Sequence, residues 1–173
     1  MAWLDVAPRR VLALVAAGCV AMLAFGLYLQ HGVGLNPCPM CIVQRYALIG
    51  VTVLSAGGAW ISRRGGWLAA SALGVLLAGF GAFVAARQSW LQWHPPEVVS
   101  CGRDFYGMIA TFPLERAIPM IFRGGGDCAA VDWTFLGGSI ANWSFLCFVG
   151  IAIVLSALVW RQFRQAPDTA SQA

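Results

Sequence analysis

The chain has 173 residues, of which 60% are apolar and only 10% charged, and its formal net charge is +4. A soluble domain is about a quarter charged, so this composition excludes a disordered protein, a coiled coil and an ordinary soluble enzyme, and leaves a polytopic membrane protein in contact with lipid. All 11 basic residues are arginine, and they are too few and too scattered for a nucleic-acid surface.

Four apolar stretches are long enough to cross a bilayer, which takes about 20 residues. They run over about residues 11–30, 41–61, 67–86 and 143–160. Glycines are frequent within them, and small residues let helices approach closely in lipid. We therefore predict an all-α membrane protein, a four-helix transmembrane bundle that forms a single domain over residues 1–173. The first apolar run is longer than that of a signal peptide, so we expect it to be retained as a helix.

Arginine positions predict the orientation of this bundle. Three pairs flank the helices on one side: Arg9 and Arg10, Arg63 and Arg64, Arg161 and Arg164. The loops on the other side, about residues 31–40 and 87–142, contain either no arginine or an excess of acidic residues. Because positive loops stay in the cytoplasm, we expect both termini to be cytoplasmic and both loops to face outward.

Four of the six cysteines fall in or at the edge of the two outward loops: Cys38, Cys41, Cys101 and Cys128. In a bacterium that side of the membrane is oxidising. The other two, Cys19 and Cys147, lie within predicted helices and are expected to be inert packing residues.

Cys38-Pro39-Met40-Cys41 forms a Cys-x-x-Cys motif at the start of the second helix. Asn36 suits the N-cap and Pro37 the first helical position. A helix N-terminus carries partial positive charge, which favours the reactive thiolate. The motif is also compatible with a static disulfide or with half of a metal site, but a Cys₄ zinc site usually has two close pairs, so we expect no metal.

Arg45 follows Cys41 by four residues, so the two share a helical face. An arginine at that depth is costly unless it faces a partner or a cavity. It either stabilises an anion, such as the Cys41 thiolate or a bound electron acceptor, or extends to the outer headgroups. Its position beside Cys41 favours the functional interpretation.

The long outer loop places Cys101 and Cys128 next to glycines, which predicts flexible backbone that another protein can reach. Its apolar part, 105–122, is compatible with an interfacial segment on the membrane or with a loop packed on the bundle, and its prolines limit any helix to short pieces. Four cysteines allow three full pairings. We expect Cys38–Cys41 with Cys101–Cys128 at rest, and Cys38–Cys128 as an intermediate.

Disulfide exchange between two pairs moves two electrons without a cofactor. The sequence contains no Rossmann fingerprint, P-loop or haem motif. The acceptor that suits a membrane protein is lipid-soluble, and a quinone is the common choice.

Over roughly residues 10–163 the chain resembles the disulfide bond formation protein B (DsbB) family. The resemblance rests on the helix order, on the Cys-x-x-Cys with Arg45 four residues later, on Cys101, and on Gly126-Asp127-Cys128 followed by Trp133, Phe135, Leu136 and Gly137. It implies a protein of the bacterial inner membrane that reoxidises a periplasmic thioredoxin-like dithiol oxidase, DsbA, and reduces a quinone of the membrane pool, ubiquinone or menaquinone.

By the same resemblance, Cys38, Cys41, Cys101 and Cys128 are catalytic. The partner's thiolate attacks Cys101 of a Cys101–Cys128 disulfide, Cys128 then attacks Cys38, and Cys41 is freed beside the quinone with Arg45 near the ring oxygens. Some members have a histidine after the third helix that acts near the quinone. Here the nearest is His94, and Arg87, Gln88 and His94 are all open as substitutes.

Two other classes remain in competition. The vitamin K epoxide reductase-like quinone reductases also use four-helix bundles with Cys-x-x-Cys, but their redox pair is expected late in the bundle, whereas here it opens the second helix. A membrane binding or assembly protein with structural disulfides or metal would also segregate its cysteines, but it leaves Arg45 beside Cys41 unexplained.

Overall fold

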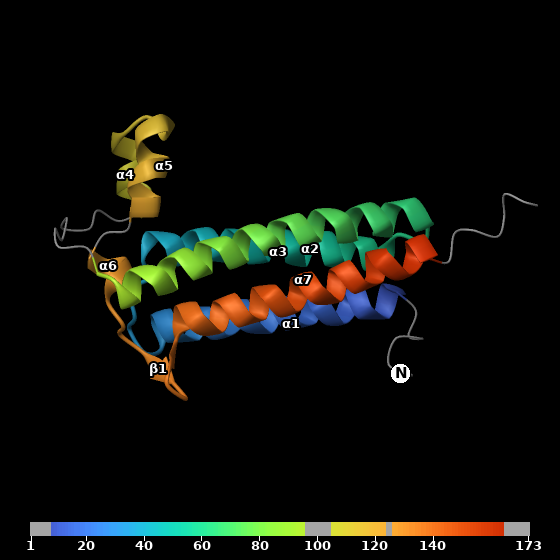
Figure 1. The fold of residues 1–173 in the computed structure, drawn as a ribbon, viewed down its shortest axis with the longest axis horizontal. Coiled ribbons are helices and arrows are strands. Elements are labelled where there is room, and N and C mark those ends of the chain that lie inside the picture. Colours follow the sequence, from blue (N-terminus) through green and yellow to red (C-terminus); the bar gives the residue numbers. More distant parts are fainter. Residues whose placement is uncertain (1–7, 96–104, 124–125, 165–173) are drawn as a thin grey trace, which may run out of the picture.

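A computed structural model describes residues 8–95, 105–123 and 126–164, and Figure 1 shows a bundle of long, roughly parallel or antiparallel helices. The bundle helices are α1 (Pro8–His31), α2 (Pro39–Trp60), α3 (Arg64–Trp93) and α7 (Ile140–Arg164). Each is long and apolar enough to cross a membrane. The predicted fold class, a bundle of four membrane-spanning helices, is confirmed.

Helix α3 is the centre of the packing, because it contacts both α2 and α7 extensively, whereas α1 packs mainly on α2. Glycines allow the close approach of α3 to α7: a methyl group on Gly74 would lie 2.8 Å from Leu155 Cδ1, and one on Gly81 would lie 2.4 Å from the Phe148 ring. Helices α1 and α7 have little contact with each other. The bundle is therefore closed along α3 and loosely joined between its first and last helices.

Two helix ends differ from the prediction, one because of a proline and the other because of burial. Helix α2 begins at Pro39, with Cys38 as its N-cap in extended backbone, and not at Pro37 with Asn36 as the cap. The residue before a proline is driven out of the helical region, so Pro39 fixes the extended conformation of Cys38. Helix α3 continues seven residues beyond the expected end at residue 86, because Gln88, Ser89 and Leu91 are buried against the bundle.

The region expected as an outer loop contains several short elements. They are α4 (Phe105–Thr111), α5 (Leu114–Arg123), α6 (Gly126–Ala129) and a hairpin of β1 (Thr134–Phe135) with β2 (Gly138–Ser139). The hairpin pairs Thr134 with Ser139 and Phe135 with Gly138. Its two turn residues both have positive φ, as a type I′ turn requires.

Helices α4 and α5 project from the side of the bundle near one end, roughly perpendicular to the long helices (Figure 1). Phe105 and Ile121 are buried in one cluster with Cys38 and Met40. This contact supports a segment packed on the bundle. The expected short helices are present and are separated at Pro113, but Pro119 does not end a helix, because α5 continues through it. Exposed apolar side chains remain on the same helices, including Ile109 and Ile118, so the interfacial prediction stays open.

The two ends of the bundle differ in chemistry. Arg9 donates to the backbone oxygen of Ala59, and Arg64 donates to that of Gln162, at the end where α1 starts and α7 finishes. The Cys-x-x-Cys motif and the short elements lie at the opposite end (Figure 1). The arginines and the outer cysteines are thus separated by the length of the helices.

Candidate redox site

Cys38 and Cys41 face each other at the N-terminus of α2. Their sulfur atoms lie 3.0 Å apart, and the Cys38 sulfur accepts a hydrogen bond from the backbone N–H of Cys41 at 3.3 Å. Both are free thiols in this structure. A disulfide bond is about 2.05 Å long, so the two sulfurs need to approach by only about 1 Å to be joined.

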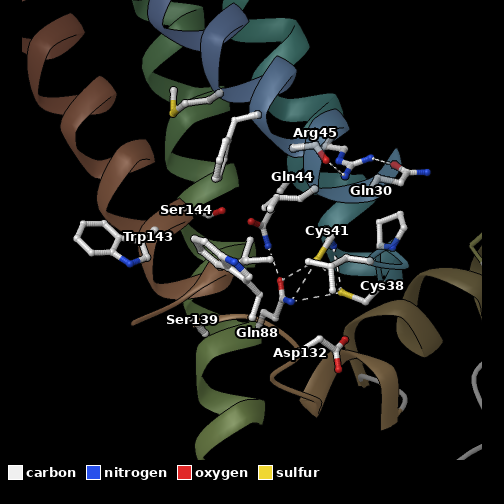
Figure 2. A pocket seen from close by; sticks show the side chains of 18 of the residues that line it. Gln30, Cys38, Cys41, Gln44, Arg45, Gln88, Asp132, Ser139, Trp143 and Ser144 are labelled. Atoms are coloured by element: carbon white, nitrogen blue, oxygen red, sulfur yellow. Dashed lines mark hydrogen bonds between the residues drawn. The ribbon is translucent and has the colours of Figure 1, made fainter. Parts of the chain in front are cut away.

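Gln88 holds both sulfurs from the neighbouring helix α3. Its Nε2 donates to the sulfur of Cys38 and to that of Cys41, each at 3.3 Å, and its Oε1 lies 3.7 Å from the Cys41 sulfur. Gln44, one turn below Cys41 on α2, donates from Nε2 to Gln88 Oε1 at 2.7 Å (Figure 2). Both glutamines are buried. The two sulfurs are therefore hydrogen-bonded to an amide, that of Gln88, which is shielded from water.

Cys128, from the short helix α6, is the third sulfur of the site. It is fully buried, shares a cluster with Cys38, and hydrogen-bonds to the Cys38 side chain. The bond to Cys128, the bond to Cys41 and burial together raise the pKa of the Cys38 thiol. Cys38 therefore lies between two candidate exchange partners and is held in its neutral form.

The expectation that Cys128 lies in flexible, reachable backbone is wrong. Helix α6 packs on α3, and Cys128 has 0% exposure in a buried cluster with Val84 and Leu91 of α3 and with Phe105 and Ile121 of α4 and α5. Cys101, which carries the same expectation, lies outside the described residues. The structure thus brings together three of the four predicted catalytic cysteines.

Arg45 lies one turn below Cys41, as its spacing predicts, but its hydrogen bonds go to α1. Its guanidinium donates to the side chain of Gln30 and, at 3.0 Å, to the backbone oxygen of Gly26 (Figure 2). A methyl group on Gly26 would lie 3.7 Å from this guanidinium. Arg45 therefore links α2 to α1, with its head group on the wall of a cavity that Cys41 also lines.

This cavity has a volume of about 760 Å³ and lies between α1, α2 and α7. Its walls are mostly apolar side chains of α1 and α7, and its polar members include Cys41, Gln44, Arg45 and Gln88. Pockets of 300–1,000 Å³ with apolar walls and a few convergent polar groups are typical of small-molecule sites. The arrangement places a thiol, an amide and a guanidinium on one wall of a ligand-sized space.

An aromatic bridge crosses from α1 to α7 at the outer end of the cavity. Phe25 meets Trp133 edge to face at 6.0 Å, Trp133 stacks on Phe135 at 6.1 Å, and Phe135 contacts Trp143 at 6.1 Å. The Trp143 indole donates to the backbone oxygen of Phe135 at 3.0 Å. The hairpin after Cys128 is thereby fastened over the gap that α1 and α7 leave between them.

The two cysteines outside the loops behave differently from each other. Cys19 is fully buried in the middle of the bundle, which confirms its expected packing role. Cys147 is exposed and lines the cavity, so the expectation of a buried packing residue is wrong for it.

Sequence reasoning missed Gln44 and left the role of Gln88 open, because both residues act across helices. Gln88 was one of three open substitutes, and it alone of the three is placed at the sulfurs, since His94 is exposed and stacks on Trp90. Gln44 carried one available signal, a polar residue one turn from Cys41 in an apolar helix. Such residues usually face the bundle interior.

Comparison with known proteins identifies the family. The family model for disulfide bond formation protein DsbB matches residues 8–158. The chain is 70% identical over 164 residues to disulfide bond formation protein B of Paracidovorax citrulli, covering 95% of this chain and 94% of the relative. It is 66% identical over 171 residues to the protein of that name from an Acidovorax species, covering 99% and 98%.

A more distant relative, disulfide bond formation protein B of an Azoarcus species, is 54% identical over 154 residues, which cover 84% of this chain and 89% of the relative. The matches extend over the bundle, the Cys-x-x-Cys motif and the segment that carries Cys128. This multi-pass membrane protein, with its paired thiols against a third sulfur, belongs to the disulfide bond formation protein B (DsbB) family.

Proposed function

We propose that this protein reoxidises a DsbA-type periplasmic dithiol oxidase and transfers the electrons to a membrane quinone, ubiquinone or menaquinone. The single observation that carries the proposal is the position of Cys38. Its sulfur contacts Cys41 on one side and Cys128 on the other, and Cys41 lines a ligand-sized apolar cavity. That order of contacts suits a relay from the loop cysteines to an acceptor in the bundle.

Each exchange in the proposed relay forms one disulfide bond and breaks another. The partner's thiolate attacks Cys101, and the Cys101–Cys128 bond breaks with its electron pair on Cys128. Cys128 attacks Cys38, and the Cys38–Cys41 bond breaks with its electron pair on Cys41. The partner's second thiolate then attacks the partner's first sulfur, which breaks that sulfur's bond to Cys101, and the partner leaves oxidised. The freed Cys101 thiolate attacks Cys128, which restores that bond and returns Cys38 as a thiolate.

The cavity fits a quinone by its chemistry. Its apolar walls suit a lipid-soluble ring and tail, and it lies where α1 and α7 have little contact. Arg45, Gln44 and Gln88 supply hydrogen-bond donors at the wall that holds Cys41. A quinone bound there would accept the two electrons released when the Cys38 and Cys41 thiolates rejoin as a disulfide, and it would take up two protons from the surrounding water to become a quinol.

Orientation completes the proposal. The arginine-flanked end of the bundle would face the cytoplasm and the cysteine end the periplasm of a bacterial inner membrane. The outer thiols would then lie in the compartment where disulfides persist.

Turnover by purified protein in detergent tests this function. Reduced DsbA-type partner and a soluble quinone are mixed with the protein, and quinone loss is followed by absorbance. We expect catalytic quinone loss, and a fall of at least about a thousandfold in Cys38→Ser, Cys41→Ser, Cys101→Ser or Cys128→Ser, because each interrupts the exchange sequence.

Cys19→Ala is the matched control, since Cys19 is a buried cysteine remote from the site, and its turnover is expected to stay near the parent's. Normal turnover in Cys41→Ser, or no quinone loss with partner and parent protein present, would refute the proposal.

A further inference from the structure

Gln44 and Gln88 form a buried amide pair whose direction is fixed. Gln44 is 6% exposed and Gln88 is 4% exposed. The Gln44 Nε2 donates to Gln88 Oε1 at 2.7 Å, which orients this oxygen as an acceptor, and the Cys41 thiol also donates to it at 3.7 Å. The Nε2 end is therefore turned toward the sulfurs of Cys38 and Cys41, at 3.3 Å from each (Figure 2).

Such a donor matters when a sulfur becomes an anion. In the proposed exchange the Cys38–Cys41 bond breaks and its electron pair remains on Cys41 as a thiolate. A hydrogen bond to a charged group is stronger than one to a neutral group, and leaving a buried charge without a partner is costly. Arg45 does not replace this donor at close range, because its guanidinium hydrogen-bonds to Gln30 and Gly26 on α1.

We propose that Gln88 stabilises the Cys41 thiolate by direct donation, and that Gln44 is a positioning residue that orients the Gln88 amide. The inference rests on the proposed function for its place in turnover, but the thiolate itself can be tested without partner or quinone. Because neither amide titrates, the donor keeps its direction and charge across the pH range in which the thiol ionises.

The test measures alkylation of Cys41 by iodoacetamide in a Cys38→Ala background, with the Cys41 peptide quantified by mass spectrometry. Since the thiolate is the reacting species, Gln88→Leu is expected to lower the rate at pH 7 about tenfold, the size of one hydrogen bond to a charged group. At a pH high enough to ionise every accessible thiol, the rates of the two proteins are expected to converge. A change in access alone would lower the rate at both pH values.

Glutamate has nearly the same shape as glutamine but places a negative charge beside the sulfur. The Cys41 alkylation rate of Gln88→Glu at pH 7 is therefore expected to be no higher than that of Gln88→Leu. This variant also keeps the test valid if Gln88→Leu fails to fold. Gln44→Leu is expected to lower the rate about threefold, a part of the same hydrogen-bond effect. In the Gln88→Leu background Gln44→Leu is expected to have no further effect, as a double-mutant cycle requires of a residue that acts through another.

Ser89→Ala is the matched control, because Ser89 is the neighbouring buried polar residue on α3 and its hydroxyl has no partner among the described residues. Its rate is expected to equal that of the Cys38→Ala parent. An unchanged Cys41 rate in folded Gln88→Leu or Gln88→Glu would overturn the role of Gln88. Equal falls from Gln44→Leu with and without Gln88 would overturn the positioning role.

The outcomes separate this inference from the proposed function. If quinone turnover fails while the alkylation results hold, the amide pair stabilises the thiolate and the relay is wrong. If turnover holds while alkylation is insensitive to Gln88, the relay stands and the amide pair has no part in it.

Discussion

Helix α7 meets its two neighbours in opposite ways. Toward α3 the approach is close, because Gly74 and Gly81 leave room for Leu155 and Phe148. Toward α1 the contact is slight, and a cavity of about 760 Å³ lies between the helices. In lipid no hydrophobic force pulls helices together, so small residues decide where they pack. One helix thus provides both the rigid side of the bundle and one wall of its ligand-sized space.

The largest effect on stability is expected at the close contact between α3 and α7. A methyl group at Gly81 would lie 2.4–2.6 Å from three atoms of the buried Phe148 ring. We expect Gly81→Ala to lower the free energy of unfolding by about 1–3 kcal/mol, as overpacking does. Thermal denaturation in detergent measures it.

Gly79→Ala is the control on the same helix, because a methyl group there meets nothing within 4 Å. It is expected to leave the melting temperature unchanged or slightly raised, as alanine is the better helix former. Equal melting temperatures for the Gly79 and Gly81 variants would mean that the glycines do not control the α3–α7 packing.

A second prediction concerns the cavity between α1 and α7, which a larger side chain would partly fill. Ala21 on α1 lines the cavity, so Ala21→Phe is expected to raise the KM for soluble quinone about tenfold, a loss of about 1.4 kcal/mol of binding. Thermal stability should change little, because the added ring occupies existing space. Steady-state kinetics with reduced partner in excess gives the KM.

Ala24→Phe adds the same ring at an exposed position of α1 that does not line the cavity. It is expected to keep the parent's KM. A KM that rises equally in both variants, or in neither, would place the quinone outside this cavity.

The smallest effect is expected at the aromatic bridge that spans the open side. Trp143→Phe keeps an aromatic ring but loses the hydrogen bond to the Phe135 backbone oxygen, which is worth about 0.5–1.5 kcal/mol. Hydrogen exchange of the hairpin at residues 134–139 should become about two to ten times faster. Trp160→Phe, an exposed tryptophan near the end of α7, should leave that exchange unchanged. Unaltered exchange in Trp143→Phe would mean that the indole does not fasten the hairpin.

The candidate site was predictable to the extent that it follows from local spacing. Cys41 and Arg45 are four residues apart on one helix, so their shared face could be read directly, and the arginine pairs marked the other end of the bundle. The partners of Arg45 were not readable, because Gln30 and Gly26 belong to another helix. The N-cap was misassigned because the effect of Pro39 on Cys38 outweighs the preference for asparagine at a cap.

The amino-acid sequence by itself determined the four membrane helices, the separation of arginine from outer cysteine, and the reactive Cys-x-x-Cys at a helix start. These are properties of composition and of residues within one or two turns, which local geometry and the bilayer constrain directly. Only the tertiary structure decided that Gln88 contacts both sulfurs, that Cys128 is buried against Cys38, and that a cavity lies between α1 and α7. Each of these depends on the rotation and spacing of helices distant in sequence, which are set by packing across the bundle.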